Sequence, residues 1–184
     1  MLDFLIAIGY NDIMLVSHES PISILEESKT YNDYDYALVH LFEEYPEYYN
    51  FFVESLKQGR EVILDNSIFE LGVAFEQQEF AKWIEKLNPT FYIVPDVLED
   101  ADATMHSFEM WNKDFSDMRG LKIGAVQGKN YRELVECYRY MVTNADLIAI
   151  SFDYSYYDIT GYGSIKEQRW MDGRKKFITA PIND

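Results

Sequence analysis

One stretch decides the fold: Val62-Ile63-Leu64-Asp65-Asn66-Ser67-Ile68-Phe69-Glu70. It begins as a short apolar, β-branched run and changes at Asp65 into acidic, amide, hydroxyl and aromatic side chains. A buried strand whose C-terminal end opens into a pocket has this pattern. The pattern recurs at 91–96 and at 122–128, with a polar residue every 31 positions at Asp65, Asp96 and Gln127. The three strands predict one site at one face of a parallel sheet or barrel.

The composition is that of a folded domain. The chain has 184 residues, of which 48% are hydrophobic and 16% aromatic, enough for a sizeable core and unlike a disordered chain. The single Cys137 excludes an internal disulfide and a cysteine-cluster metal site. The apolar run at 2–8 is too short for a membrane span and lacks the basic flank of a signal peptide. We expect one soluble domain over residues 1–184, in a reducing compartment.

The charge is strongly negative and unevenly distributed. The net charge is −16, but residues 161–184 carry five basic and three acidic side chains, so this segment is +2 and the remaining 160 residues are −18. Such a surface repels phosphate backbones. A nucleic-acid contact would therefore be confined to a basic edge or be supplied by a partner.

Apolar runs and helical stripes alternate along the chain. Strands are expected at 4–8, 13–16, 62–65, 91–94, 122–126 and 147–150. The aromatic-rich segment 31–52 predicts two helices or one broken helix, with one stripe from Leu38 to Tyr45, a second from Tyr49 to Leu56, and Pro46 in a first turn. Further helices are expected at 80–87, 105–115, 131–145 and 165–178, the last capped by Ser164.

This alternation predicts an α/β fold. No glycine-rich G-x-G-x-x-G or P-loop follows the first strand, so a nucleotide site of either type is disfavoured. A TIM-type (β/α) barrel is preferred, although only about six of its eight strands can be counted. The expectation is an incomplete barrel.

Asp65 is the first candidate catalytic residue. A barrel places its catalytic groups at strand ends, where Asp65 could act as general base, general acid or nucleophile. The alternative is a helix N-cap or turn acid, which is common at a β–α junction. The cluster Asp-Asn-Ser-x-Phe favours function.

The other strand ends suggest a purine-like ligand. Asp96 could accept two N–H groups from a planar heterocycle, unless it too is an N-cap. Gln127 can donate and accept at a carbonyl edge, and Gly128 allows close backbone approach. Phe69 could stack on the ring, although a core aromatic is the commoner role.

Metal chemistry and nucleophile-elbow chemistry are not indicated. The histidines His18, His40 and His106 are scattered without H-x-H or H-x-x-x-H spacing, and no G-x-S-x-G occurs. We expect no metal and no cofactor. A different barrel hydrolase that uses Asp65 and Asp96 as an acid–base pair stays open as an alternative, and predicts no affinity for deazaguanines.

Four stretches resemble the tRNA-guanine transglycosylase superfamily, which includes the queuine tRNA-ribosyltransferases. The similarity is greater to the phage and bacterial branch that places 7-deazaguanines in DNA. The stretches are Ile63-Leu64-Asp65-Asn66-Ser67-Ile68-Phe69-Glu70, Val94-Pro95-Asp96-Val97-Leu98, Ile123-Gly124-Ala125-Val126-Gln127-Gly128-Lys129 and Ile150-Ser151-Phe152-Asp153-Tyr154.

The resemblance implies a role for each matching residue. Asp65 takes the place of the acid beside the scissile glycosidic bond, Asn66 of its neighbouring polar contact and Phe69 of the aromatic stacked on the base. Asp96 would bind the N–H edge of the base, and Gln127 with Gly128 its carbonyl side. Ser151, a further base-binding candidate, and Phe152 replace a Gly-Gly-Leu turn of the tRNA enzymes, which alters the pocket around the 7-substituent.

The resemblance also implies a function with a missing part. Guanine in nucleic acid, DNA rather than tRNA, would be replaced by a 7-deazaguanine. The family's nucleophilic Asp, and the Cys₃His zinc site of its tRNA enzymes, belong to later strands than this chain contains. We therefore expect either an enzyme completed by a homo-oligomer or partner chain, or a non-catalytic base-binding short form. The expected location is the cytoplasm of a bacterium or phage-infected cell.

Overall fold

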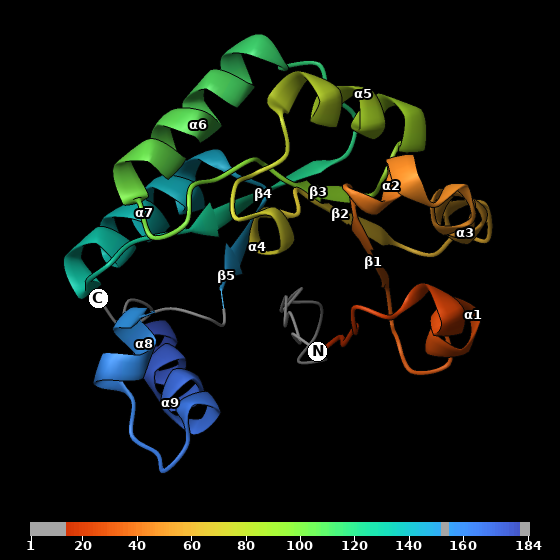
Figure 1. Cartoon of the computed structure of the whole chain (residues 1–184). Helices are drawn as coiled ribbons and strands as arrows, with labels where there is room; N and C mark the ends of the chain where they lie inside the picture. The colour runs from red at the N-terminus through yellow and green to blue at the C-terminus, as the bar shows by residue number, and fades with distance from the viewer. Residues whose placement is uncertain (1–13, 152–154, 181–184) are drawn as a thin grey trace.

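The computed structural model describes residues 14–151 and 155–180 and contains one parallel sheet (Figure 1). Its strands are β1 (Asp35–Leu38), β2 (Val62–Asp65), β3 (Phe91–Ile93), β4 (Leu121–Val126) and β5 (Leu147–Ile150). They lie in the order β1-β2-β3-β4-β5, and every pair of neighbours is parallel. The carboxyl ends of all five strands therefore meet at one edge of the sheet.

Helices fill the connections between strands. The bounds are η1 (Ile22–Ile24), α1 (Leu25–Ser28), α2 (Leu41–Glu44), α3 (Pro46–Lys57), α4 (Ile68–Leu71), α5 (Gln77–Leu87), α6 (Ala101–Asp114), α7 (Tyr131–Asn144), α8 (Ser155–Thr160) and α9 (Lys166–Thr179). Helices α3, α5, α6 and α7 lie on the same side of the sheet in Figure 1. The expected α/β fold, with a parallel sheet alternating with helices, is confirmed.

The two faces of the sheet have different neighbours because successive strand residues point to opposite sides. Residues such as Val62, Leu64 and Tyr92 share one core cluster with buried residues of α3, α5, α6 and α7. The other face has its own cluster, made almost entirely of strand residues: Tyr34, Tyr36, Leu38, Ile63, Phe91, Ile93, Ile123, Ala125 and Ala149. The polar residues at the carboxyl ends of the strands border this second face, because the strand residues Ile93, Ala125 and Ala149 line the same cavity as they do.

The segment 31–45 was predicted correctly only in part: a short helix, α2, does precede the helix that begins at Pro46, but the residues before it form a strand. Asp35–Leu38 is a strand, whereas the sequence suggested that a helical stripe begins at Leu38. Tyr34, Tyr36 and Leu38 alternate toward one face, and β1 pairs in register with β2 from Asp35↔Val62 to Leu38↔Asp65. The backbone bonds to β2 and the burial on both faces outweigh the local helical spacing, and only the short α2 follows.

The predicted strand 13–16 is also not observed at its described positions, 14–16. Val16 is held instead by Asp33, whose carboxylate accepts the Val16 N–H at 2.8 Å and whose N–H donates to the Val16 carbonyl at 2.8 Å. These two hydrogen bonds to a single residue do not form the repeated backbone pairing of a β-strand. The strand predicted at 4–8 lies outside the described residues.

The later elements follow the prediction more closely. Strands β2 to β5 and helices α3, α5 and α7 lie where the patterns placed them, with Pro46 in the first turn of α3. Ser164 does not cap α9, because Ile165 is the N-cap and the Ser164 hydroxyl bonds Gln168 instead. Among the described residues, none of the helices has the length and apolar character needed to cross a lipid bilayer.

Candidate functional site

Four strand ends bring polar side chains to one buried place. Asp65 is the last residue of β2, Asp96 follows β3, and Gln127 and Ser151 come directly after β4 and β5. Each is less than one-tenth exposed. With Asn66 and Phe69 they line a cavity of about 20 Å³, whose remaining walls are the apolar side chains Ile68, Ile93, Ala125 and Ala149. That volume holds about one water molecule.

Asp65 is a buried carboxylate with two hydrogen-bond donors. The Tyr36 hydroxyl donates to its Oδ2 at 2.5 Å, and the Ser67 N–H donates to its Oδ1 at 2.6 Å. Burial raises the pKa of Asp65 to about 7, and the two hydrogen bonds oppose this shift. The negative charges of Glu70 and Asp96 raise the pKa further. Asp65 can therefore take up or release a proton near neutral pH, as a general acid–base group must.

Asp96 is the centre of a second set of hydrogen bonds. Asn66 Nδ2 donates to Asp96 Oδ1 at 2.8 Å and also to the Val94 carbonyl at 3.2 Å. Gln127 Nε2 donates to Asp96 Oδ2 at 2.5 Å, while Gln127 Oε1 accepts the Glu99 N–H at 2.8 Å. Burial raises the pKa of Asp96, and the two amide donors lower it. Each Asp96 oxygen keeps a further lone pair for a ligand.

Neither acid is a helix cap, but Asp65 is a turn acid, which was the other half of its alternative explanation. The N-cap of α4 is Ser67, which has no side-chain capping bond, and the N-cap of α6 is Asp100, whose carboxylate accepts the Ala103 N–H. Asp65 instead closes a tight turn with Ser67, whose φ of 59° lies in the left-handed region. A non-glycine residue there is held at a cost of about 1–3 kcal/mol, and such strain clusters at functional sites.

The remaining predicted residues differ in their positions. Phe69 lines the cavity from α4. Ser151 lines it as well, and its Oγ is buried without a hydrogen-bond partner among the described residues. Gly128 is not one of the lining residues; a Cβ there would lie 2.9 Å from Glu133 Cβ, so its small size serves the packing of α7. Phe152 lies outside the described residues.

Tyr36 is the site residue that sequence reasoning missed. Its hydroxyl makes the shortest contact to Asp65, yet it lies in the segment to which a helical pattern was assigned. The signal that could have found it is the alternation Tyr34, Tyr36, Leu38, which has the period of a strand. The register of β1 with β2 then places Tyr36 on the same face as Asp65.

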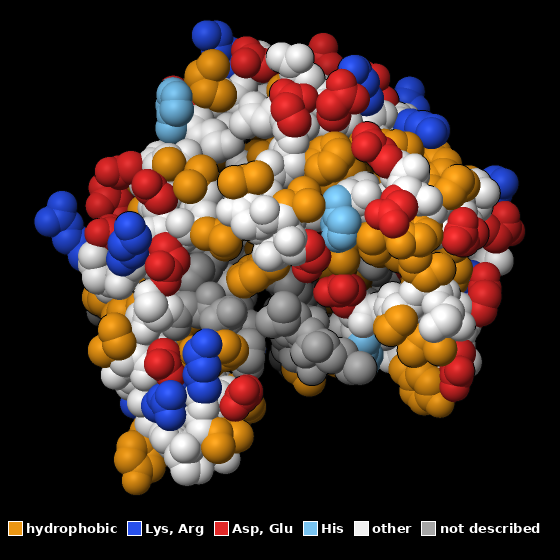
Figure 2. All heavy atoms as spheres, viewed as in Figure 1, with side chains coloured by type: hydrophobic (Ala, Val, Ile, Leu, Met, Phe, Trp, Pro, Cys, Tyr) orange, Lys and Arg blue, Asp and Glu red, His pale blue; other side chains and the backbone are white. Residues whose placement is uncertain are grey.

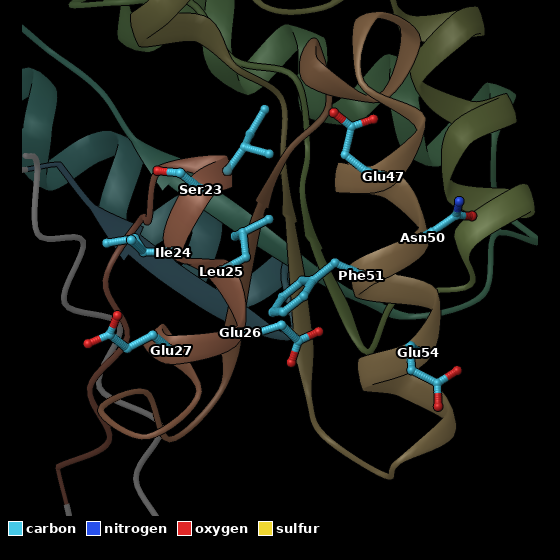
Figure 3. A pocket seen from close by; sticks show the side chains of 10 residues that line it. Ser23, Ile24, Leu25, Glu26, Glu27, Glu47, Asn50, Phe51 and Glu54 are labelled. Atoms are coloured by element: carbon cyan, nitrogen blue, oxygen red, sulfur yellow. The ribbon is translucent and has the colours of Figure 1, made fainter.

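The larger cavities are surface grooves of another kind. One of about 550 Å³ lies between α1 and α3, with Phe51 directed from α3 toward α1 (Figure 3). Its acids Glu26, Glu27, Glu47 and Glu54 are all exposed to solvent, unlike the buried carboxylates of the strand-end cavity. Among the described residues, no group of three or more His, Cys, Asp and Glu side chains is placed to hold a metal ion.

Comparisons with known proteins add no family to this geometry. Neither a scan against protein-family models nor a search of curated proteins finds a match to the chain. The strand-end cavity and its hydrogen bonds are therefore the features that indicate what this site can bind.

Proposed function

We propose that the strand-end cavity recognises a guanine-type base and that the protein serves guanine transglycosylase-type base exchange, in which a 7-deazaguanine replaces guanine in nucleic acid. The observation that carries this proposal is the pair of buried carboxylates, Asp65 and Asp96, at the ends of adjacent strands. They share one cavity with Asn66, Gln127 and Ser151. The resemblance of the same stretches to the transglycosylase superfamily supports the same assignment.

The polar groups of the cavity select for N–H-rich ligands. Neither lysine nor arginine is among its lining residues, so an anionic ligand such as a phosphate or carboxylate would meet two buried acids without a countercharge. A neutral heterocycle with several N–H donors satisfies carboxylate oxygens and lets buried polar groups remain paired. Guanine and 7-deazaguanines present such an edge through N1–H and the exocyclic amine.

Each residue has a role in this proposal. Asp96 accepts the N–H edge of the base with the lone pairs that Asn66 and Gln127 leave unused. Ser151 supplies the one lining hydroxyl that has no partner in the described chain, and it would bind the carbonyl edge or the 7-substituent. Asp65 manages the proton at the glycosidic nitrogen, which its pKa of about 7 allows in both directions.

Binding requires the cavity to enlarge, because about 20 Å³ holds a single water and not a purine ring. Helix α4 is the element best suited to move. It has four residues, it is bounded by the left-handed residues Ser67 and Gly72, and it carries Phe69. A small displacement of α4 would let Phe69 stack on an incoming base.

A second candidate is a non-catalytic base-binding protein or one subunit of a split transglycosylase. It is favoured by the site itself, because Asp65 and Asp96 already have roles and, among the residues that the structure describes, no third carboxylate lines the cavity to attack the sugar. Under this alternative, a second copy or another chain supplies the nucleophile.

DNA is preferred to tRNA as the polymer. The DNA contact would lie over α8 and α9, where basic side chains appear among acidic ones at the lower left of Figure 2.

Calorimetric titration with guanine and 7-cyano-7-deazaguanine tests the base site. We expect the purified chain to bind the base and Asp96→Asn to lose binding. Asp100→Asn is the matched control, because it makes the same carboxylate-to-amide change at an exposed helix-capping residue, and its binding should be unchanged. Absence of binding by the folded chain, or equal binding by Asp96→Asn, would refute the base assignment. Incorporation of labelled guanine into DNA then separates the two candidates, since only a complete enzyme exchanges bases.

A further inference from the structure

Tyr36 is placed to control Asp65 from the neighbouring strand. In the β1–β2 register Leu38 is opposite Asp65 and Tyr36 is opposite Ile63, so Tyr36 is the diagonal neighbour of Asp65 on the same face. Its side chain is buried, and its hydroxyl reaches Asp65 Oδ2 at 2.5 Å. A long aromatic side chain can span this diagonal distance, whereas a shorter one at the same position could not.

The two donors to Asp65 differ in what they allow. The Ser67 N–H at Oδ1 can only donate, so that side of the carboxyl favours the ionised form. The Tyr36 hydroxyl donates to the carboxylate and could also accept a proton from the neutral acid, but the donating arrangement is a charge-assisted bond and the stronger one. Both donors fix the plane of the carboxyl group and leave the remaining lone pairs for the cavity.

We propose that Tyr36 is a positioning residue, whose hydroxyl orients the Asp65 carboxyl group toward the cavity and stabilises its ionised form. Without this hydroxyl, the buried carboxyl would lose its strongest stabilising contact and remain protonated to higher pH. The part of this inference that concerns chemistry rests on the proposed function. The part that concerns the titration of Asp65 stands on the structure alone.

The groups that surround Asp65 make the hydroxyl necessary. Those that influence it come from four elements and are Tyr36 of β1, Tyr48 of α3, Glu70 of α4 and Asp96 after β3. None of these is a cation, and both acids disfavour a second negative charge at Asp65. Hydrogen bonds, and not a lysine or arginine side chain, therefore stabilise the negative charge of the ionised Asp65.

The test is the titration of Asp65 in Tyr36→Phe, followed through its carboxyl carbon by NMR. A hydrogen bond to a charged group corresponds to roughly one pKa unit or more, so we expect the midpoint to move upward by at least about one unit. Tyr92→Phe is the matched control, because it removes a buried hydroxyl from the adjacent strand on the opposite face, where its partner is Trp111. The control should leave the Asp65 midpoint unchanged.

Base binding supplies the functional readout. In Tyr36→Phe the pH dependence of 7-cyano-7-deazaguanine affinity should move upward with the Asp65 midpoint, while the affinity on the high-pH plateau stays within about twofold of wild type. A purely structural role would lower affinity equally at every pH. A folded Tyr36→Phe protein with an unshifted Asp65 midpoint would overturn the inference.

The same measurements keep the two proposals distinguishable. If the Asp65 midpoint moves in Tyr36→Phe but wild type binds neither guanine nor 7-cyano-7-deazaguanine, the assignment of Tyr36 stands and the proposed ligand is wrong. If wild type binds base and the midpoint does not move, the ligand stands and Tyr36 has only a packing role. If Tyr36→Phe does not fold, two other replacements at position 36 are compared: tryptophan, which retains a ring N–H donor, and 4-fluorophenylalanine, which has no donor. The Asp65 midpoint of Tyr36→Trp should lie nearer to the wild-type midpoint than that of the 4-fluorophenylalanine protein. Equal Asp65 midpoints in these two proteins would contradict the inference.

Discussion

Replacing Asp65 by Asn should change how the stability of the protein depends on pH. The native pKa of Asp65 is about 7, against an ordinary value of 3.8, and burial is the main cause. Between these values the folded protein binds a proton that the unfolded chain releases. The contribution of Asp65 to the free energy of unfolding is therefore fully present below the unfolded pKa and is lost as the pH rises through about 7.

The size of the effect follows from the shift. Each pH unit inside the window changes the free energy of unfolding by about 1.4 kcal/mol. Between about pH 5.5 and about pH 8.5, wild type should lose about 2 kcal/mol that Asp65→Asn does not lose. The variant also loses an acceptor for the Ser67 N–H if the amide nitrogen faces it, a cost of about 1–3 kcal/mol that is independent of pH.

Urea denaturation measures this difference, with tryptophan fluorescence and circular dichroism as probes. The informative quantity is the slope of the wild-type minus Asp65→Asn difference against pH, because the other titrating groups are common to both proteins. A difference that is flat between about pH 5.5 and about pH 8.5 would show that the native pKa of Asp65 lies below this range and would refute the reasoning.

Two further changes test one contact near the site and one at the opposite end of the sheet. Gly128→Ala should lower stability by about 1–3 kcal/mol in the same urea assay, because the new Cβ would lie 2.9 Å from Glu133 Cβ and from the Leu134 nitrogen; unchanged stability would contradict this close approach. Asp35→Ala removes the carboxylate that accepts from Arg60 Nε at 2.8 Å and from Nη2 at 2.9 Å. We expect a loss of about 2 kcal/mol by thermal or urea unfolding, less than for a fully buried pair because the Arg60 side chain is 23% exposed; a variant as stable as wild type would show that the pair contributes nothing net.

The regular part of the fold is local enough to be predicted from the chain. Strands β2 to β5 are short apolar runs bounded by turn residues, and α3, α5 and α7 have clear apolar stripes. Strand β1 was missed for a physical reason. Its last residue, Leu38, was assigned to a helical stripe that continues to Tyr45, and the alternation of Tyr34, Tyr36 and Leu38 becomes decisive only with the pairing to Val62–Asp65. A segment of four residues does not by itself indicate which strand it will pair with.

The candidate site divides in the same way. The sequence by itself determined that Asp65, Asp96 and Gln127 follow buried strands, because apolar runs end there and parallel strands end at one edge. Only the tertiary structure decided that Asn66 and Gln127 both donate to Asp96, that Tyr36 donates to Asp65, and that the cavity is about 20 Å³. These features depend on strand register and side-chain packing between segments about 30 residues apart, and a pattern read along one segment does not contain that information.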